Sequence, residues 1–525
     1  MAKVRNILFI MCDQLRADHL SCYGHTRLNT PAIDTLAARG TRFSRAFVTA
    51  PVCGPSRMSY YTGRYTLSHG ATWNFVPLPV GERTLGDYLR PAGLRVAVTG
   101  KTHFEPDLAG MKWLGLSPRE GVGRLLATGG FEEVWRDDGI HPDHSTPADL
   151  VYNQYLRANG FKGVNPWHEW ANSGADEQGN VASGWFLRNS HLPTRLPEKF
   201  SETAYTTRRA MEFITEQGEQ PWCLHLSYIK PHWPYIAPAP YHDMFGPEDC
   251  LPPVRSEAER SDRANPIFRG FQEHPECVSF SRDEVRRNVL PAYMGLVKQI
   301  DDHLGQLMGF LEKAGRLEDT LIVFTADHGD YLGDHWQGEK EFMYEQGVRV
   351  PLIVVDPSED AKRGQVSDAL VSAVDMVPTF IDALGLEIPS HIVEGYSLMP
   401  LLRGSQIKLR DAAFAELDYA IYPTARKLGL KAREARMLMV RTERWKLVHF
   451  GRDLPPQLFD LRDDPLELED LGRDQGASAR SARDDLYGLA FEWMRDRRNR
   501  IGMTDTAVDK RPSPAAAGGV KIGVW

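Results

Sequence analysis

Short apolar runs that end at a polar residue recur along the first three-quarters of the chain. The runs cover residues 6–12, 95–99, 222–229, 321–326 and 352–355. They are rich in Ile, Val, Leu and Phe without polar alternation, which is typical of strands buried on both faces. Between them lie helical patterns, of which the clearest spans residues 293–311. We interpret Asp301 and Asp302 as the solvated edge of that helix. The alternation predicts an α/β domain whose large, mostly parallel sheet is sandwiched by helices.

The pattern changes near residue 410. Three segments alternate like short strands, at residues 437–440, 445–450 and 457–461. A helix-like segment follows at residues 477–498. They predict a smaller α+β domain. The last stretch is rich in Pro, Ala and Gly and ends in an apolar sequence, which indicates either a disordered terminus or an oligomerisation arm. We therefore divide the chain into a large domain at residues 1–405, a smaller C-terminal domain at residues 406–500 and an extended tail at residues 501–525.

Composition excludes several classes of protein. The 525 residues are 42% hydrophobic and 25% charged, as in ordinary globular proteins. A net charge of −8 argues against a general nucleic-acid binder. The six cysteines show no paired spacing, which argues against a disulfide framework. The apolar run at residues 7–11 is too short for a signal peptide, and no apolar stretch reaches membrane-spanning length. We expect a cytoplasmic protein with no nucleic-acid or membrane partner.

Polar residues with catalytic potential follow the apolar runs. Asp13, Lys101, His232, Asp327 and Asp356 each stand directly after or close to the end of one run. The carboxyl ends of parallel strands lie at one edge of a sheet, and binding sites gather at that edge. The sequence therefore predicts that residues far apart along the chain meet in one site.

A cysteine stands in the most distinctive motif of the chain, Cys53-Gly54-Pro55-Ser56-Arg57, which is followed by Thr62-Gly63-Arg64. A lone cysteine among small residues is usually a buried, inert hydrophobe. Here, however, Pro55 favours the first turn of a helix and Ser56 favours its cap. The free N–H groups of a helix start favour an anion, and Arg57 and Arg64 add fixed positive charge. This combination suits an anionic ester.

The Cys-x-Pro-Ser-Arg motif followed by Thr-Gly-Arg resembles the signature of the type I sulfatases. In that family the cysteine is oxidised after synthesis to formylglycine, an aldehyde that hydrates to a geminal diol. The diol supplies an oxygen nucleophile and a way to release the product. The resemblance thus implies that Cys53 is the catalytic residue and that a formylglycine-generating or other sulfatase-maturing enzyme is a partner.

Asp13 and the run Thr325-Ala326-Asp327-His328-Gly329 resemble the metal motifs of the alkaline phosphatase superfamily, to which the sulfatases belong. The resemblance implies one divalent cation. Its ligands would be Asp13, Asp327, His328 and the modified Cys53, with Gln14 as a candidate further ligand. Oxygen-rich sites suit Ca²⁺, whereas an imidazole makes Mn²⁺ plausible, so both metals stay open.

The stretch Gly100-Lys101-Thr102-His103 is similar to the Gly-Lys-x-His motif that sulfatases place on the sulfate and the formylglycine. The resemblance also implies that Lys340 binds sulfate and that His232 contacts the ester oxygen. An unperturbed histidine pKa of about 6.5 suits protonation of the leaving group. We expect Arg57 to help Lys101 and Lys340 hold the sulfuryl oxygens. Asn74 is a weaker candidate for an anion donor.

Other features are similar to the phosphonate monoester hydrolases, namely Asp13-Gln14, Asp327-His328, residues 230–238 and the ending at residues 522–525. That subgroup carries Tyr and Thr where this chain has Lys101 and His103. We therefore predict an arylsulfatase-type hydrolase with promiscuity toward phosphate and phosphonate esters. One alternative is a phosphonate monoester hydrolase or phosphodiesterase. Another is a non-catalytic anion-binding protein in which Cys53 stays a thiol. We expect a homodimer or homotetramer.

Overall fold

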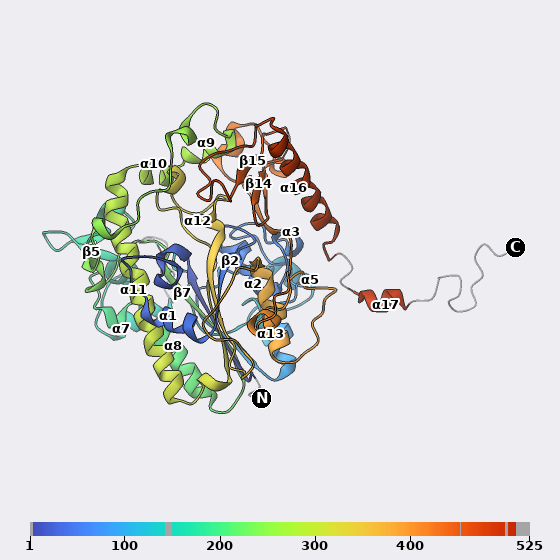
Figure 1. Ribbon diagram of the computed structural model, residues 1–525. Coiled ribbons are helices and arrows are strands. Elements are labelled where there is room, and N and C mark those ends of the chain that lie inside the picture. The colour runs from blue at the N-terminus through green and yellow to red at the C-terminus, as the bar shows by residue number, and fades with distance from the viewer. Residues whose placement is uncertain (1–3, 142–149, 452, 499–501, 511–525) are drawn as a thin grey trace.

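The computed structural model describes residues 4–141, 150–451, 453–498 and 502–510 (Figure 1). The larger sheet runs in the order β10 (Gln365–Ser367), β2 (Thr41–Phe47), β9 (Arg349–Val355), β8 (Thr320–Ala326), β1 (Asn6–Asp13), β7 (Trp222–Pro231), β3 (Arg95–Gly100) and β4 (Glu132–Arg136), with β11 (Val371–Ser372) beside β2. All five predicted strands are confirmed. Within the described part of this larger sheet, β9 alone runs antiparallel to its neighbours.

The reversal of β9 corrects one expectation. Asp356 follows β9 and was expected at the same edge as the other polar residues. Because β9 is antiparallel to β8, its carboxyl end lies at the opposite edge of the sheet. Asp356 is buried there and accepts a hydrogen bond from the backbone N–H of Ser358. It therefore takes no part in the site described below.

Helices cover both faces of the larger sheet. Figure 1 shows α1 (Pro31–Arg39), α8 (Glu202–Gln217) and α11 (Asp283–Lys313) on one side and α2 (Cys53–Thr62) and α13 (Met376–Ala383) on the other. Seven of the eight apolar positions predicted for α11 are buried, and the eighth, Met308, is partly buried. Asp301, expected to be solvated, is instead buried. Its Oδ1 accepts hydrogen bonds from the backbone N–H groups of Ala32 and Ile33, at the start of α1.

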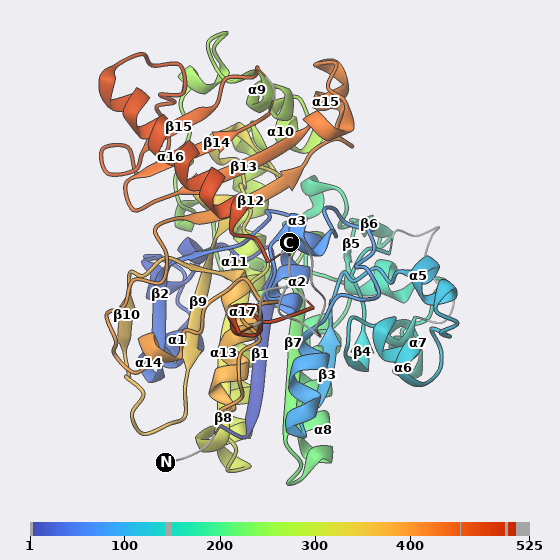
Figure 2. The same cartoon turned by 90° about the vertical axis from the view of Figure 1, so that its right-hand side faces the viewer.

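A second, antiparallel sheet confirms the smaller α+β unit. It consists of β12 (Ala413–Asp418), β13 (Arg436–Arg441), β14 (Trp445–His449) and β15 (Gln457–Asp460), covered by α16 (Ala477–Arg495). Figure 2 shows this sheet beyond the end of the larger sheet that is opposite the N-terminus. The Glu416 N–H donates to the carbonyl of Thr49 at 2.7 Å and so joins β12 to the loop after β2. A domain boundary near residue 405 stays a prediction.

Some features were not predicted or are not described. The sequence pattern did not single out β2, β4, β10, β11 or β12. The tail contains a short helix, α17 (Asp505–Asp509), whereas residues 511–525, where we expected an oligomerisation arm, lie outside the described residues. Among the described residues, no helix combines the length and apolar character needed to cross a membrane.

Candidate active site

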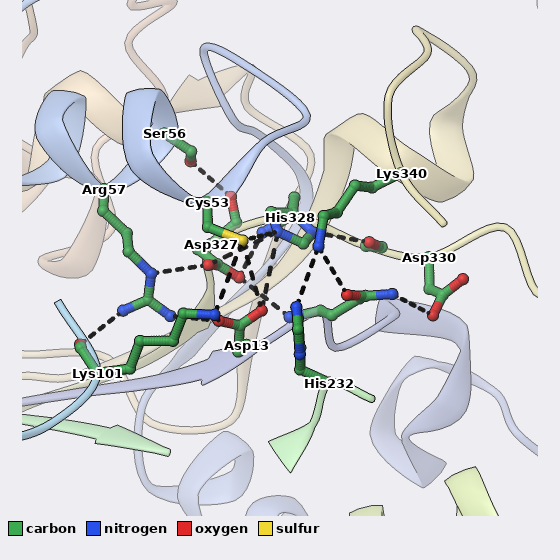
Figure 3. Close-up of polar contacts among 12 residues, drawn as sticks. Asp13, Cys53, Ser56, Arg57, Lys101, His232, Asp327, His328, Asp330 and Lys340 are labelled. Atoms are coloured by element: carbon green, nitrogen blue, oxygen red, sulfur yellow. Dashed lines mark hydrogen bonds and ion pairs between the residues drawn. The ribbon is translucent and has the colours of Figure 1, made fainter. Parts of the chain in front are cut away.

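The carboxyl ends of four strands and the start of one helix bring the predicted residues together (Figure 3). Asp13 ends β1, whereas Lys101, His232 and Asp327 directly follow β3, β7 and β8. Cys53 is the first residue of α2, and its side chain faces the other four. All five side chains are buried. The prediction that these distant residues meet is therefore confirmed.

The start of α2 is built by a residue from outside the helix. Val52 is the N-cap and has no side chain that can accept a hydrogen bond. Instead, Oδ1 of Asn74 accepts the backbone N–H of Gly54 at 2.8 Å and satisfies one of the free donors of the first turn. Asn74 thus holds the helix start that carries Cys53. Its role as a donor to a bound anion stays a prediction.

Two residues of the signature differ from their expected roles. Ser56 does not cap the helix, because α2 already begins at Cys53. Its hydroxyl donates to the backbone carbonyl of Asp327 at 2.5 Å and ties the helix to the loop after β8. Arg64 was expected to add charge at the site, but it forms an ion pair with Glu82 at 3.1 Å. Its charge is therefore largely offset there.

Four donor atoms form a compact buried cluster. Atoms of Asp13, Cys53, Asp327 and His328 all lie within 4.8 Å of one another. The His328 Nδ1–H donates to the carbonyl of Gly329 at 2.9 Å, so Nε2 is left with its lone pair facing the cluster. Nε2 lies 3.1 Å from Sγ of Cys53. Two carboxylates, an imidazole and the side chain of Cys53 form a donor set that fits one divalent cation.

The electrostatic field at Cys53 favours a negative charge. Burial by itself would raise the pKa of this thiol. The positive charges of Lys101, of Lys340 and, when its Nε2 is protonated, of His328 outweigh burial and hold the pKa of Cys53 well below its ordinary value. The position is therefore suited to an anionic nucleophile or to the oxygens of an anionic substrate.

Arg57 holds the two carboxylates and does not point at an open space. Its Nε donates to Oδ2 of Asp327 at 2.8 Å, and its Nη2 donates to Oδ2 of Asp13 at 3.1 Å. Its Nη1 donates to the carbonyl of Lys101 and the hydroxyl of Ser227. The guanidinium is fully buried by these partners. Four of the five N–H donors of Arg57 are thus engaged by residues of the protein. The expected contact of Arg57 with the sulfuryl oxygens stays a prediction.

Lys101 and His103 lie on the side of the cluster that carries Cys53. Nζ of Lys101 lies 2.6 Å from Oδ2 of Asp13 and 3.9 Å from Sγ of Cys53. The backbone of His103 has a positive φ of 48° and is held by a hydrogen bond from its N–H to Oδ1 of Asp138. The ring of His103 is buried, and neither ring nitrogen has a hydrogen-bond partner among the described residues. Both nitrogens are thus available to a ligand or a proton.

Lys340 and His232 form the opposite side. Nζ of Lys340 donates to Oε1 of Gln14 at 3.0 Å and to Nε2 of His232 at 3.2 Å. The His232 Nδ1–H donates to the carbonyl of Trp233 at 2.8 Å, which assigns the lone pair to Nε2. Burial, with the positive charge of Lys101, lowers the pKa of His232 to about 3. This corrects the expectation of an unperturbed histidine.

The sequence reasoning did not single out two residues that orient Gln14. Asp330 accepts hydrogen bonds from Nε2 of Gln14 at 2.6 Å and from the hydroxyl of Tyr235 at 2.5 Å. These contacts direct the amide oxygen of Gln14 toward Lys340. Gln14 as a metal ligand stays a prediction. Tyr235 lies within residues 230–238, the segment that is similar to the phosphonate monoester hydrolases. Asp330 is buried, but from the sequence alone it cannot be told from an ordinary turn residue.

The fold and the cluster agree with comparisons to known proteins. The sulfatase family profile matches residues 5–386, and a profile described as N-sulphoglucosamine sulphohydrolase, C-terminal, matches residues 333–483. The chain therefore belongs to the sulfatase family and is a sulfuric ester hydrolase with an alkaline phosphatase-like fold.

Individual relatives cover nearly the whole chain. It is 31% identical to the multifunctional alkaline phosphatase superfamily protein PehA of Trinickia caryophylli, over 90% of this chain and 92% of that protein. An arylsulfatase of Clostridium perfringens is 27% identical, over 89% and 90% of the two chains. Among solved structures, the phosphonate monoester hydrolase of Silicibacter pomeroyi is 28% identical and superposes with a TM-score of 0.81, covering 96% and 98%. That of Agrobacterium radiobacter, also 28% identical, has a TM-score of 0.77 and covers 94% and 95%.

Proposed function

We propose that this chain hydrolyses sulfate esters of the arylsulfatase type, with a formylglycine made from Cys53 and one divalent cation, Ca²⁺ or Mn²⁺. The observation that carries the proposal is the pair Lys101 and His103 beside Cys53, with Nζ of Lys101 3.9 Å from Sγ. A sulfuryl group has three oxygens that need donors as the nucleophile approaches. Lys101 on one side and Lys340 on the other supply cationic donors.

In this proposal each chain residue has a defined task. Asp13, Asp327 and His328 hold the cation, which when bound supplies Lewis-acid stabilisation of negative charge at the reacting oxygens. Arg57 keeps the two carboxylates in position. The ring of His103, with both nitrogens unpartnered among the described residues, accepts a proton from the hydroxyl at position 53.

The leaving oxygen needs a proton from the other side of the site. His232 and Lys340 were both candidates, and the hydrogen-bond directions favour Lys340. His232 Nε2 accepts from Lys340, so the proton between them belongs to the lysine ammonium. We propose that Nζ of Lys340 donates to the departing alcohol or phenol and that His232 keeps the ammonium in place. Covalent catalysis of this kind divides one hard displacement into two easier steps.

A second candidate is hydrolysis of phosphonate monoesters or phosphodiesters. It is favoured by the likeness of the whole chain to two phosphonate monoester hydrolase structures at 28% identity. Sulfate and phosphate mono-anions share geometry, so we propose promiscuity toward phosphate and phosphonate esters. A homodimer or homotetramer and a sulfatase-maturing enzyme as partner also belong to the proposal.

Two measurements test the proposal. The Cys53 peptide is analysed by mass spectrometry after reaction with a carbonyl-trapping reagent, because hydration of the aldehyde nearly restores the mass lost on oxidation. The enzyme, with its metal quantified, is then assayed on an aryl sulfate, phosphate monoester, phosphodiester and phosphonate that share one leaving group. We expect a trapped carbonyl and the highest kcat/KM for the sulfate. A wide preference for the phosphonate or phosphodiester supports the second candidate, and an untrapped thiol without turnover supports the non-catalytic alternative.

A further inference from the structure

A hollow of about 870 Å³ lies between residues 185–191 and the start of α11. Trp185, Leu187 and Val285 form apolar parts of its lining. None of the residues assigned to the proposed chemistry lines this hollow, so it is a separate feature of the surface. Its position is decided by the segment between β6 (Val181–Ser183) and α8, which packs against the first turns of α11.

Two indole rings connect the hollow to the catalytic residues. The Trp185 ring lies 5.1 Å from the Trp233 ring, measured between centroids, and the Trp233 ring lies 4.2 Å from the imidazole of His232. Nζ of Lys340 lies 5.6 Å from the centroid of Trp233. Trp185 and Trp233 are both half-buried. An aromatic path therefore runs from His232 and Lys340 to the hollow.

The hollow is also strongly basic, although the chain carries a net charge of −8. Arg188, Arg282 and Arg287 line it and are exposed. Across the parts of the chain that the structure describes, none of the ion pairs involves these three guanidinium groups, and the neighbouring carboxylate of Asp283 pairs with Arg255 at 2.6 Å. Glu284 is the acidic residue of the lining. Three guanidiniums against one carboxylate leave an uncompensated positive charge, which favours an anionic occupant.

We propose that this hollow is a leaving-group subsite for sulfate esters whose alcohol or phenol carries an apolar ring system and a second anionic group. The proposal rests on the proposed function, because it places the sulfuryl group at Cys53 and the ester oxygen at Lys340. The leaving group then passes over Trp233 and Trp185, and its distal anion reaches the arginines. The apolar rings and the charge act together, since neither alone selects such a ligand.

The test uses two substrates that differ in one charge, biphenyl-4-yl sulfate and 4′-carboxybiphenyl-4-yl sulfate. We expect the wild-type enzyme to favour the carboxylated ester about tenfold in kcat/KM, through a lower KM, and the preference to shrink in high salt. The triple variant R188Q/R282Q/R287Q should lose this preference but keep its activity on 4-nitrophenyl sulfate. Trp185→Leu should lower kcat/KM for both biphenyl esters and leave 4-nitrophenyl sulfate within about twofold.

Arg480→Gln is the matched control, because Arg480 is an exposed arginine on α16 in the smaller unit, away from the hollow. Equal kcat/KM for the two biphenyl esters in the wild type overturns the subsite, as does a preference that survives in the triple variant or disappears in Arg480→Gln. If the wild-type enzyme hydrolyses none of the sulfate esters, that result would instead refute the proposed function. In that case the subsite is tested separately, by measuring how strongly 4′-hydroxybiphenyl-4-carboxylate quenches the tryptophan fluorescence of the wild type and of the triple variant. Weaker quenching in the triple variant supports the subsite, and equal quenching overturns it.

Discussion

The ammonium group of Lys340 lies 3.2 Å from Nε2 of His232 and is the donor in that hydrogen bond. Although burial opposes its charge, the negative groups near it, Cys53 and Glu339, raise the pKa of Lys340 well above its ordinary value. Lys340→Met should therefore lower kcat/KM for esters with poor leaving groups by about 10²- to 10⁴-fold and should affect good leaving groups less. A series of aryl sulfates of graded phenol pKa measures this difference.

His232→Gln is the comparison, because an amide oxygen can still accept from Lys340. We expect a smaller loss that depends less on the leaving group. With its pKa near 3, His232 stays neutral above pH 5 and should contribute no limb to the pH–rate profile near pH 6.5. A limb near pH 6.5 that vanishes in His232→Gln would indicate that His232 is the acid. An equal loss across all leaving groups in Lys340→Met would contradict the assignment of Lys340 as the acid.

The second prediction concerns Arg57, which joins Asp13 and Asp327 through one guanidinium. Lysine keeps the charge but lacks the planar guanidinium, whose Nε and Nη2 donors are held in fixed directions toward the two carboxylates. Arg57→Lys should weaken binding of the divalent cation about 10- to 100-fold and should lower activity at limiting metal. Titration of the metal-depleted enzyme gives the affinity, and excess metal should restore part of the rate. Unchanged metal affinity together with a large rise in KM would instead indicate direct contact between Arg57 and the substrate.

The third prediction concerns Cys53. Cys53→Ala removes the side chain that we propose as the precursor of the nucleophile and should abolish turnover, while the fold and most metal binding persist. Cys53→Ser keeps an oxygen but lacks the second hydroxyl of a hydrated aldehyde, so we expect at most single-turnover chemistry. Product formation in a burst assay and metal content by elemental analysis check both variants. Near-normal turnover by Cys53→Ala would refute the formylglycine mechanism.

The fourth prediction concerns Lys101 and His103, which stand where phosphonate monoester hydrolases carry Tyr and Thr. The double variant Lys101→Tyr/His103→Thr should lose roughly 10²-fold or more in kcat/KM for an aryl sulfate, because a cationic donor to the sulfuryl oxygens is gone. The loss should be smaller for a phosphonate with the same leaving group, so the preference shifts. Equal losses for both substrates would mean that these residues do not select between them.

The fifth prediction concerns stability at acid pH. His225 is buried between the hydroxyl of Tyr61 and the carbonyl of Phe9, and burial lowers its pKa to about 3. Unfolding restores a pKa of about 6.5, so between pH 6.5 and 3 the unfolded chain binds the extra proton. Because of this residue, the free energy of unfolding should fall by about 1.4 kcal/mol for each unit by which the pH is lowered in this window.

Urea unfolding at pH 7, 6 and 5 measures this slope in the wild type and in His225→Gln. The variant should show the smaller slope, and the difference between the two proteins cancels any contribution from bound metal. Parallel slopes, or a His225 resonance that titrates near pH 6.5 in the folded protein, would contradict the assignment.

Local sequence was enough to predict most of the site. Strands that are buried on both faces have to be continuous apolar runs, so β1, β3, β7 and β8 could be read directly. Their polar continuations, among them Asp13, Lys101 and Asp327, then had to share an edge because the strands are parallel. The signature around Cys53 added the proposed nucleophile, which the structure places beside these residues. These inferences succeed because they depend on spacing within one segment at a time.

Strand direction could not be predicted in the same way. The run that forms β9 has the same apolar character as its neighbours, but it pairs antiparallel with both β2 and β8. The apolar pattern of a strand indicates that it is buried but not in which direction it runs. Asp356 was therefore grouped with the site although it lies at the opposite edge of the sheet. Short or partly exposed strands such as β4 carried too weak a pattern to be recognised.

The sequence by itself determined which chemical groups this protein has: the Cys53 signature, the Asp and His side chains of the cluster, the lysines and the α/β framework that gathers them. The tertiary structure decided how these groups are used. It fixed Arg57 on two carboxylates, Asn74 on the start of α2, and the proton between Lys340 and His232 on the lysine. The reason is physical, because hydrogen-bond direction and desolvation depend on neighbours brought together by folding and not on adjacent residues in the chain.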